Sequence, residues 1–278
     1  MKVDTKEANP AFLSIIQNPS QKVFLDANFF IPPDRSEVAK IRAYSFNDFK
    51  ECWLIPLLNE FGGLVIHESV YDELVADNVK HYVDEQTSSD PPKLKIHYDS
   101  ELNSMEEALR NTYMNRIAVH SLYNPTRDNA KDRGEVRSLS FMAVKQFLFF
   151  AANDSLPVRL IKNASELKTG LDDIQIIQMY ELIYYLYKTN RYHKKELRIL
   201  YKYQYYLTPG DKRVNPEWKS FIEQINSNLK NNTPYPNPNL LTILQKLPRS
   251  ILPTKFLMKQ ERKLILNPML KADLLQKL

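Results

Sequence analysis

Two short apolar segments, KVFLDANFFI and FLFFAAND, each contain one aspartate. Their lengths and their β-branched and aromatic residues predict buried strands with Asp26 and Asp154 at the carboxyl ends. A carboxylate in such surroundings costs free energy unless it is paired, hydrogen-bonded or bound to a cation. Ligands of open α/β sheets bind at the carboxyl ends of the strands, so we expect both aspartates at a site. For Asp26 the alternative is a simple capping role in the turn after the strand.

The rest of the first 206 residues alternates strands and helices, which predicts an α/β fold. A helix is expected over 45–61, where Gly62 and Gly63 stop it. Residues 64–66 form a strand that turns directly into a helix, and the polar, proline-broken segment 84–100 is expected to be a surface loop. Further helices are expected over 104–123, 135–146, 170–190 and 192–207, with a short edge strand over 157–161.

Charge divides the chain into two parts. Residues 1–206 contain 26 basic and 28 acidic residues, a balance of −2, whereas residues 207–278 contain 12 and 5, a balance of +7. We therefore expect a domain over 1–206 and a basic, proline-punctuated helical extension over 207–278, which packs on the domain or on a partner. Such an extension suits a polyanion such as nucleic acid, or is a solvated lysine-rich face.

Composition excludes several kinds of site. No apolar run reaches 18 residues, so no membrane span is expected, and the first residues lack the pattern of a secretion signal. The single cysteine, Cys52, forms no internal disulfide and no cysteine-built zinc site. The five histidines show no metal-ligand spacing. A reducing, cytoplasmic setting fits this composition.

Two further acids follow predicted elements near the same edge of the sheet. Glu73 lies in the helix after the second strand, and Glu135 begins the helix before the FLFFAAND strand. With Asp26 and Asp154, these carboxylates could converge, and unneutralised they would raise one another's pKa values. A hard divalent cation removes that repulsion, and carboxylate oxygens suit Mg²⁺ or Mn²⁺.

Alternatives remain for two of the four positions. Glu68 and Asp72 lie in the same predicted helix as Glu73. The segment DRGE also fits a helix N-terminus, with Asp132 as the capping acid and Glu135 three residues later, which needs no metal. Asp132 could equally replace Glu135 as the ligand.

The segments VFLDANFF, VYDEL, DRGEV and AAND, in this order, resemble the acidic signature of the PIN domain family of metal-dependent nucleases. The resemblance spans residues 20–205, and its GE pair and Asn-Asp pair particularly resemble the bacterial toxin-like branch. It implies a three-layer α/β/α sandwich with a small, mainly parallel sheet. The implied cofactor is one or two Mg²⁺ or Mn²⁺ ions.

The resemblance also implies roles for individual residues. Asp26, Glu73, Glu135 and Asp154 would be the metal-binding catalytic acids, Glu73 being preferred within its helix because DEL fits the family pattern. Asn28 would help to hold the first acid or the substrate, and Asn153 and Asp132 would support the ligands. The implied activity is endonucleolytic cleavage, usually of RNA, which leaves a 5′-phosphate and a 3′-hydroxyl. A toxin or defence role would bring an antitoxin or other protein partner, and a homodimer is also conceivable.

Rival interpretations follow from the same residues. The chain could be a non-catalytic PIN-like module that binds nucleic acid or protein, or a nuclease that acts on DNA. The run YYLYKTNRYHKKELRILYKYQYY mixes tyrosines with basic residues, a combination that binds single strands. Its tyrosines also recur at helical spacing, which is typical of a core. Asp172 and Asp173 are expected at a helix N-terminus.

Overall fold

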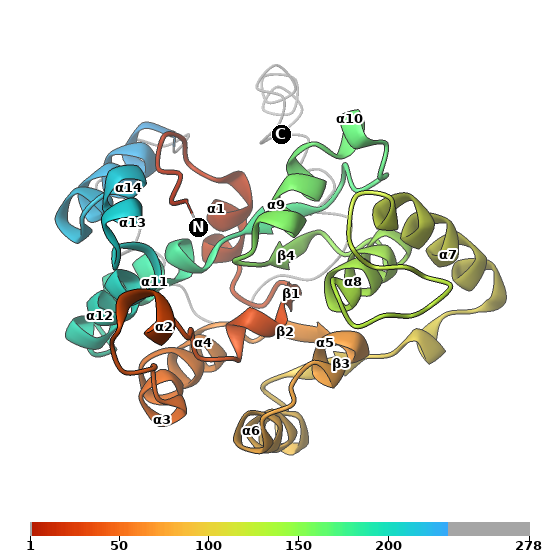
Figure 1. The fold of residues 1–278 in the computed structure, drawn as a ribbon, viewed down its shortest axis with the longest axis horizontal. Coiled ribbons are helices and arrows are strands. Elements are labelled where there is room, and N and C mark those ends of the chain that lie inside the picture. The colour runs from red at the N-terminus through yellow and green to blue at the C-terminus, as the bar shows by residue number, and fades with distance from the viewer. Residues whose placement is uncertain (1, 233–278) are drawn as a thin grey trace, which may run out of the picture. The chain divides into compact units, whose positions relative to one another are not determined.

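The computed structural model describes residues 2–232, and its centre is a parallel five-stranded sheet (Figure 1). The strands lie in the order β3-β2-β1-β4-β5, and every neighbouring pair is parallel. Their bounds are β1 Val23–Leu25, β2 Leu64–His67, β3 Lys95–His97, β4 Phe149–Ala151 and β5 Gln175–Ile177. Parallel strands need crossover connections, which helices supply here. The predicted α/β class is confirmed.

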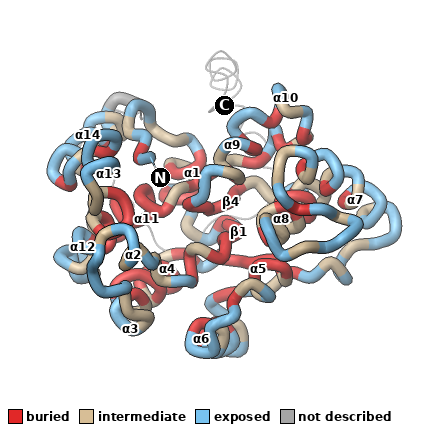
Figure 2. The backbone as a smooth tube through the Cα atoms, viewed as in Figure 1, coloured by how far each residue is buried: buried red, intermediate tan, exposed pale blue. Residues whose placement is uncertain are grey.

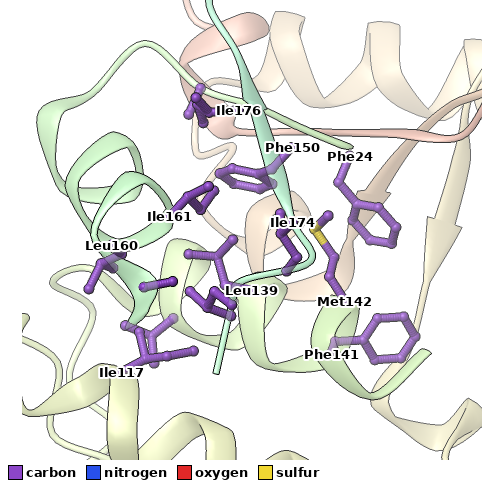
Figure 3. Packing of buried hydrophobic residues seen from close by; sticks show 14 of the residues in the cluster. Phe24, Ile117, Leu139, Phe141, Met142, Phe150, Leu160, Ile161, Ile174 and Ile176 are labelled. Carbon is purple, nitrogen blue, oxygen red and sulfur yellow. The ribbon is translucent and has the colours of Figure 1, made fainter. Parts of the chain in front are cut away.

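Helices cover both faces of the sheet, so the three-layer α/β/α architecture is also confirmed. On one face, Phe24 and Phe150 pack against Leu139 and Leu160 in a continuous apolar cluster (Figure 3). Side chains alternate along a strand, so the neighbours of Phe24 point to the other face. The helices of the first face are α7 Ser104–Ala118, α8 Arg133–Lys145, α9 Ser155–Lys162 and α10 Ala164–Leu167. The second face has α1 Pro10–Gln17, α4 Ile55–Glu60 and α11 Met179–Lys188. Burial is concentrated in the strands and the helices beside them (Figure 2).

Three more helices follow α11 and pack outside it: α12 Lys194–Tyr205, α13 Pro209–Val214 and α14 Trp218–Asn232. The ring of Tyr201 stacks on Phe221 with 4.4 Å between centroids. Tyr184, Tyr203 and Tyr205 are buried as well, so these tyrosines belong to the core and do not offer faces to bases. The remainder of the predicted extension, 233–278, lies outside the described residues. No helix within residues 2–232 combines the length and apolar content that a membrane span requires.

The predicted loop over 84–100 is wrong at both ends. Helix α6, Asp77–Ser88, runs into it, and β3 forms its last part. In β3 only His97 is buried, because the strand lies at the edge of the sheet with one partner, β2. An edge strand with one lysine and one buried residue has no apolar signature, so the sequence pattern missed it.

Two elements near the end of the sheet were also predicted wrongly. Residues 157–161 lie in helix α9, where Leu156 and Leu160 recur at helical spacing. Part of the predicted helix 170–190 is strand β5, and α11 begins only at Met179. Glu181, not Asp172 or Asp173, is therefore the acid in the first turn of that helix.

The predicted helix 45–61 is present as one continuous helical run. It consists of α3 Phe46–Phe49, a π-helical turn η2 Lys50–Leu54, and α4. Pro56 has no backbone N–H and so cannot donate a hydrogen bond to the preceding turn of the helix. The wider π-helical turn before it accommodates the missing hydrogen bond. The remaining short helices are η1 Ala27–Phe29, α2 Ser36–Ala39, α5 Glu68–Asp72 and η3 Asp99–Glu101.

The glycine pair after α4 gives a matched test of the fold. A Cβ atom at Gly63 would lie 2.1 Å from the backbone oxygen of Gln21, whereas one at Gly62 would meet nothing within 4 Å. We predict that Gly63→Ala destabilises the fold by about 1–3 kcal/mol, as overpacking does, and that Gly62→Ala changes stability by about 0.5 kcal/mol or less. Urea unfolding of both variants measures this, and equal midpoints would contradict the packing described here.

Candidate metal centre

The carboxyl ends of β1 and β4 locate the candidate site. Leu25 pairs with Ala151, and the N–H of the next residue, Asp26, donates to the Ala151 carbonyl over 3.0 Å. From β1 the sheet extends through β2 to β3 on one side, and from β4 to β5 on the other. The strand order therefore reverses between β1 and β4, and ligands of open α/β sheets bind at such a switch point. Asp26 and Asp154 follow these two strands, as predicted.

Three of the predicted acids meet at this point. Asp26, Glu135 and Asp154 each offer a carboxylate oxygen, and these oxygens lie within 4.8 Å of one another. Asp26 is only 1% exposed, Glu135 is half-buried and Asp154 is exposed. The acids come from three elements: the start of η1, the first turn of α8 and the start of α9. Because Asp154 is exposed, a cation could reach this group of hard oxygen donors from solvent.

Asn28, in η1, joins two of these carboxylates. Its Nδ2 atom donates to Asp26 Oδ2 over 3.0 Å and to Asp154 Oδ2 over 2.7 Å. The amide group thus fixes the two oxygens relative to each other, although Asn28 and Asp154 are 126 residues apart in sequence. Asn28 was predicted to support the first acid, and in the structure it lies between Asp26 and Asp154.

Mutual repulsion and burial dominate the electrostatics of the group. Burial raises the pKa of Asp26 well above its usual value, and the charges of Glu135, Asp154 and Glu73 raise it further. Burial also raises the pKa of Glu135 to about 7, with added repulsion from Glu73 and Asp132. A bound cation would favour the ionised forms of these same carboxylates.

Glu73 lies at the end of α5 and outside the group of three. Its Oε1 atom accepts a hydrogen bond from the Gly134 N–H over 2.8 Å, and its charge still contributes to the raised pKa of Asp26. A Cβ atom at position 134 would lie 2.6 Å from that oxygen, so glycine is required for this approach. Glu73 thereby ties α5 to the first turn of α8, the turn that carries Glu135. The glycine of DRGE is explained by this contact.

Asp132 does not cap α8 with its side chain, and it lies outside the group of three acids. Its backbone is left-handed, with φ of 56°, and its side chain makes no capping bond to α8, so the capping box is absent. Its Oδ2 atom instead accepts from the Leu122 N–H over 2.7 Å, which holds the preceding loop. Between Asp132 and Glu135, the structure brings Glu135 to the other acids.

Asn153 is buried and turns toward the C-terminal helices. Its Oδ1 atom lies 2.6 Å from the hydroxyl of Tyr205, at the end of α12. Sequence reasoning missed Tyr205, since nothing in a tyrosine-rich helix distinguishes the one tyrosine that reaches the sheet from those that pack between helices.

A second polar group lies at the ends of β2 and β3. His67, Glu68 and Asp99 could also offer metal ligands, but Asp99 already pairs with the guanidinium groups of Arg110 and Arg137. Two cations therefore occupy the carboxylate that a metal would need. His67 meets Asp99 only because β3 pairs with β2, so their proximity could not be read from sequence spacing.

The raised pKa of Glu135 predicts a pH-dependent stability in the presence of a chelator. Its carboxyl releases its proton near 4.5 in the unfolded chain and near 7 in the folded one, so its contribution to stability is lost as the pH rises through this window. We predict that Glu135→Gln has a higher Tm than the wild type at pH 8 in EDTA and a similar Tm at pH 4.5. Calorimetry measures both, with Glu107→Gln, an exposed acid on α7, as control. A Tm at pH 8 below that of the wild type would contradict the repulsion.

A scan against protein-family models, a search of curated proteins and a search of solved structures each found no match to this chain. The functional argument therefore depends on the geometry and chemistry of the residues themselves.

Proposed function

We propose that this chain is a metal-dependent nuclease that hydrolyses phosphodiester bonds in RNA. The observation that carries the proposal is the convergence of Asp26, Glu135 and Asp154 at the switch point of a parallel sheet. A structural role for these acids would not require three carboxylates to share one place at the cost of mutual repulsion. A ligand that is positively charged relieves that repulsion.

The donor set fits Mg²⁺ or Mn²⁺. Carboxylate oxygens are the ligands that these hard ions prefer, and the three acids offer one each within 4.8 Å. When bound, such an ion makes a coordinated water more acidic and stabilises negative charge on phosphate oxygens. Asp26, Glu135 and Asp154 would hold the cation.

Other residues of the chain keep this arrangement in place. Asn28 holds the Asp26 and Asp154 carboxylates together through its two hydrogen bonds. Glu73 adds a fourth negative charge and fixes the N-terminus of α8 through Gly134. No histidine would be needed for this chemistry, because a bound cation would supply the acidity of the water.

The resemblance to the PIN family supports RNA as the substrate, and it also suggests the further biological roles. We propose a toxin or defence effector of the cytoplasm, where cellular RNA is found, with an antitoxin or other protein partner. The balance of +7 over residues 207–278 would favour contact with nucleic acid. Homodimer formation belongs to the same proposal.

Cleavage assays test the activity. We predict that Asp26→Asn and Asp154→Asn each lower Mg²⁺-dependent cleavage of single-stranded RNA by about 100-fold or more, because each removes charge that holds the cation. Asp172→Asn, a neutralised exposed aspartate outside the group, should cleave like the wild type. A parallel DNA oligonucleotide separates ribonuclease from deoxyribonuclease activity. Full activity in the Asp26→Asn/Asp154→Asn double variant would exclude the proposed site.

Metal binding can be measured without substrate. A ligand that binds only the folded state stabilises it, by about 2.7 kcal/mol at 100 times its Kd. We predict that Mn²⁺ raises the Tm of the wild type at pH 7.5 and not that of the Asp26→Asn/Asp154→Asn variant. A Tm increase without any cleavage of RNA or DNA would favour the non-catalytic binding module over the nuclease.

A further inference from the structure

Tyr205 connects the C-terminal helices to the candidate metal centre. It is the last residue of α12 and is 1% exposed. Its hydroxyl lies 2.6 Å from Oδ1 of Asn153, which is 5% exposed and immediately precedes Asp154. A buried hydroxyl group this close to a buried amide constrains the amide strongly, because an unmade hydrogen bond there would cost about 1–3 kcal/mol.

The direction of this hydrogen bond follows from the chemistry of its two groups. The Tyr205 hydroxyl can donate, whereas an amide oxygen can only accept, so Tyr205 donates to Asn153 Oδ1. The amide oxygen of Asn153 therefore faces Tyr205, and its Nδ2 atom points away.

The Nδ2 atom of Asn153 is a donor that the fold does not use. Within residues 2–232 it makes no hydrogen bond, while Oδ1 of the same side chain is bound. Asn28 is the other amide at these strand ends, and its Nδ2 atom donates hydrogen bonds to the two aspartates. Asn153 thus keeps a neutral donor beside Asp154, where the carboxylates themselves can only accept.

The end of α12 is held in place from two directions. Asn215 donates to the Tyr205 carbonyl over 2.7 Å. Arg35 donates to the Gln204 carbonyl over 2.9 Å and pairs with Asp211 at 2.9 Å. Arg35 lies shortly after η1, the element that carries Asn28. The segment that leaves the acid group is therefore bound to the helix that supplies Tyr205.

We propose that Tyr205 is a positioning residue of the nuclease site, through which Asn153 donates its Nδ2 hydrogen bond to a non-bridging oxygen of the scissile phosphate. This inference rests on the proposed function. An oriented amide donor stabilises charge that develops on a phosphate oxygen without weakening the carboxylates that hold the cation. Helix α12 is then a part of the active site and not an attachment to it.

Removal of the hydroxyl alone tests the inference, and α12 offers a matched control. Tyr201 is also buried, and its hydroxyl donates to the Pro216 carbonyl over 2.8 Å, away from the acids. We predict that Tyr205→Phe lowers kcat for RNA cleavage by about 10-fold and Asn153→Ala by about 100-fold, with Mn²⁺ affinity unchanged. Tyr201→Phe should keep the wild-type kcat despite a similar loss of Tm. Rates are compared at a temperature below the Tm of every variant.

A double-variant cycle separates positioning from a general effect on stability. If Tyr205 acts through Asn153, the Asn153→Ala/Tyr205→Phe variant has the kcat of Asn153→Ala alone, because the donor is already absent. Multiplicative losses, or equal kcat values for Tyr205→Phe and Tyr201→Phe, would overturn this inference while the wild-type cleavage stands. A wild type that neither binds Mn²⁺ nor cleaves RNA or DNA would overturn the proposed function and the inference together.

Discussion

The burial of the Asp26 carboxylate among other acids is the constraint that the rest of the structure satisfies. Its side chain is almost inaccessible and its neighbours include Glu135, Asp154 and Glu73, so both desolvation and repulsion favour its protonated form. The hydrogen bond from Asn28 opposes them by lowering the pKa of Asp26. A fold that gains stability from these acids would separate them. In this fold several elements keep them together, which is the arrangement expected of the metal site proposed above.

Much of the central architecture could be predicted because its signals are local. The segments around Phe24 and Phe150 are apolar enough to be recognised as buried strands, and the acids that end them mark the edge where they meet. The edge strands β3 and β5 were missed for a physical reason. β3 buries only His97 and so has no apolar signature, whereas β5 buries Ile176 and Ile177 but lies in an apolar run that continues into α11 and fits a helix equally well. Hydrogen bonds to the next strand decide the structure of both segments, and those bonds depend on residues distant in sequence.

The candidate site shows the same division. Asp26, Glu135 and Asp154 could be predicted to converge, since each lies at the end of a recognisable element. The contacts that support them could not. By its place in the sequence Asp132 fits a helix cap, yet its side chain accepts a hydrogen bond from the Leu122 N–H instead. Tyr205 donates to Asn153, which lies 52 residues away in sequence. Supporting contacts of this kind depend on side-chain directions that no residue pattern encodes.

The Glu73–Gly134 contact has a consequence for how this sequence can vary. The two positions are 61 residues apart, and each restricts the other. Any side chain at position 134 would collide with the carboxylate of Glu73, so Ala or Ser is compatible with the fold only when residue 73 is shortened or turned away. A side chain at position 134 therefore costs the hydrogen bond that ties α5 to α8, because the Glu73 carboxylate has to move away from it. In laboratory evolution the two positions would be coupled: once residue 73 has been shortened, a substitution at position 134 has no such contact left to lose.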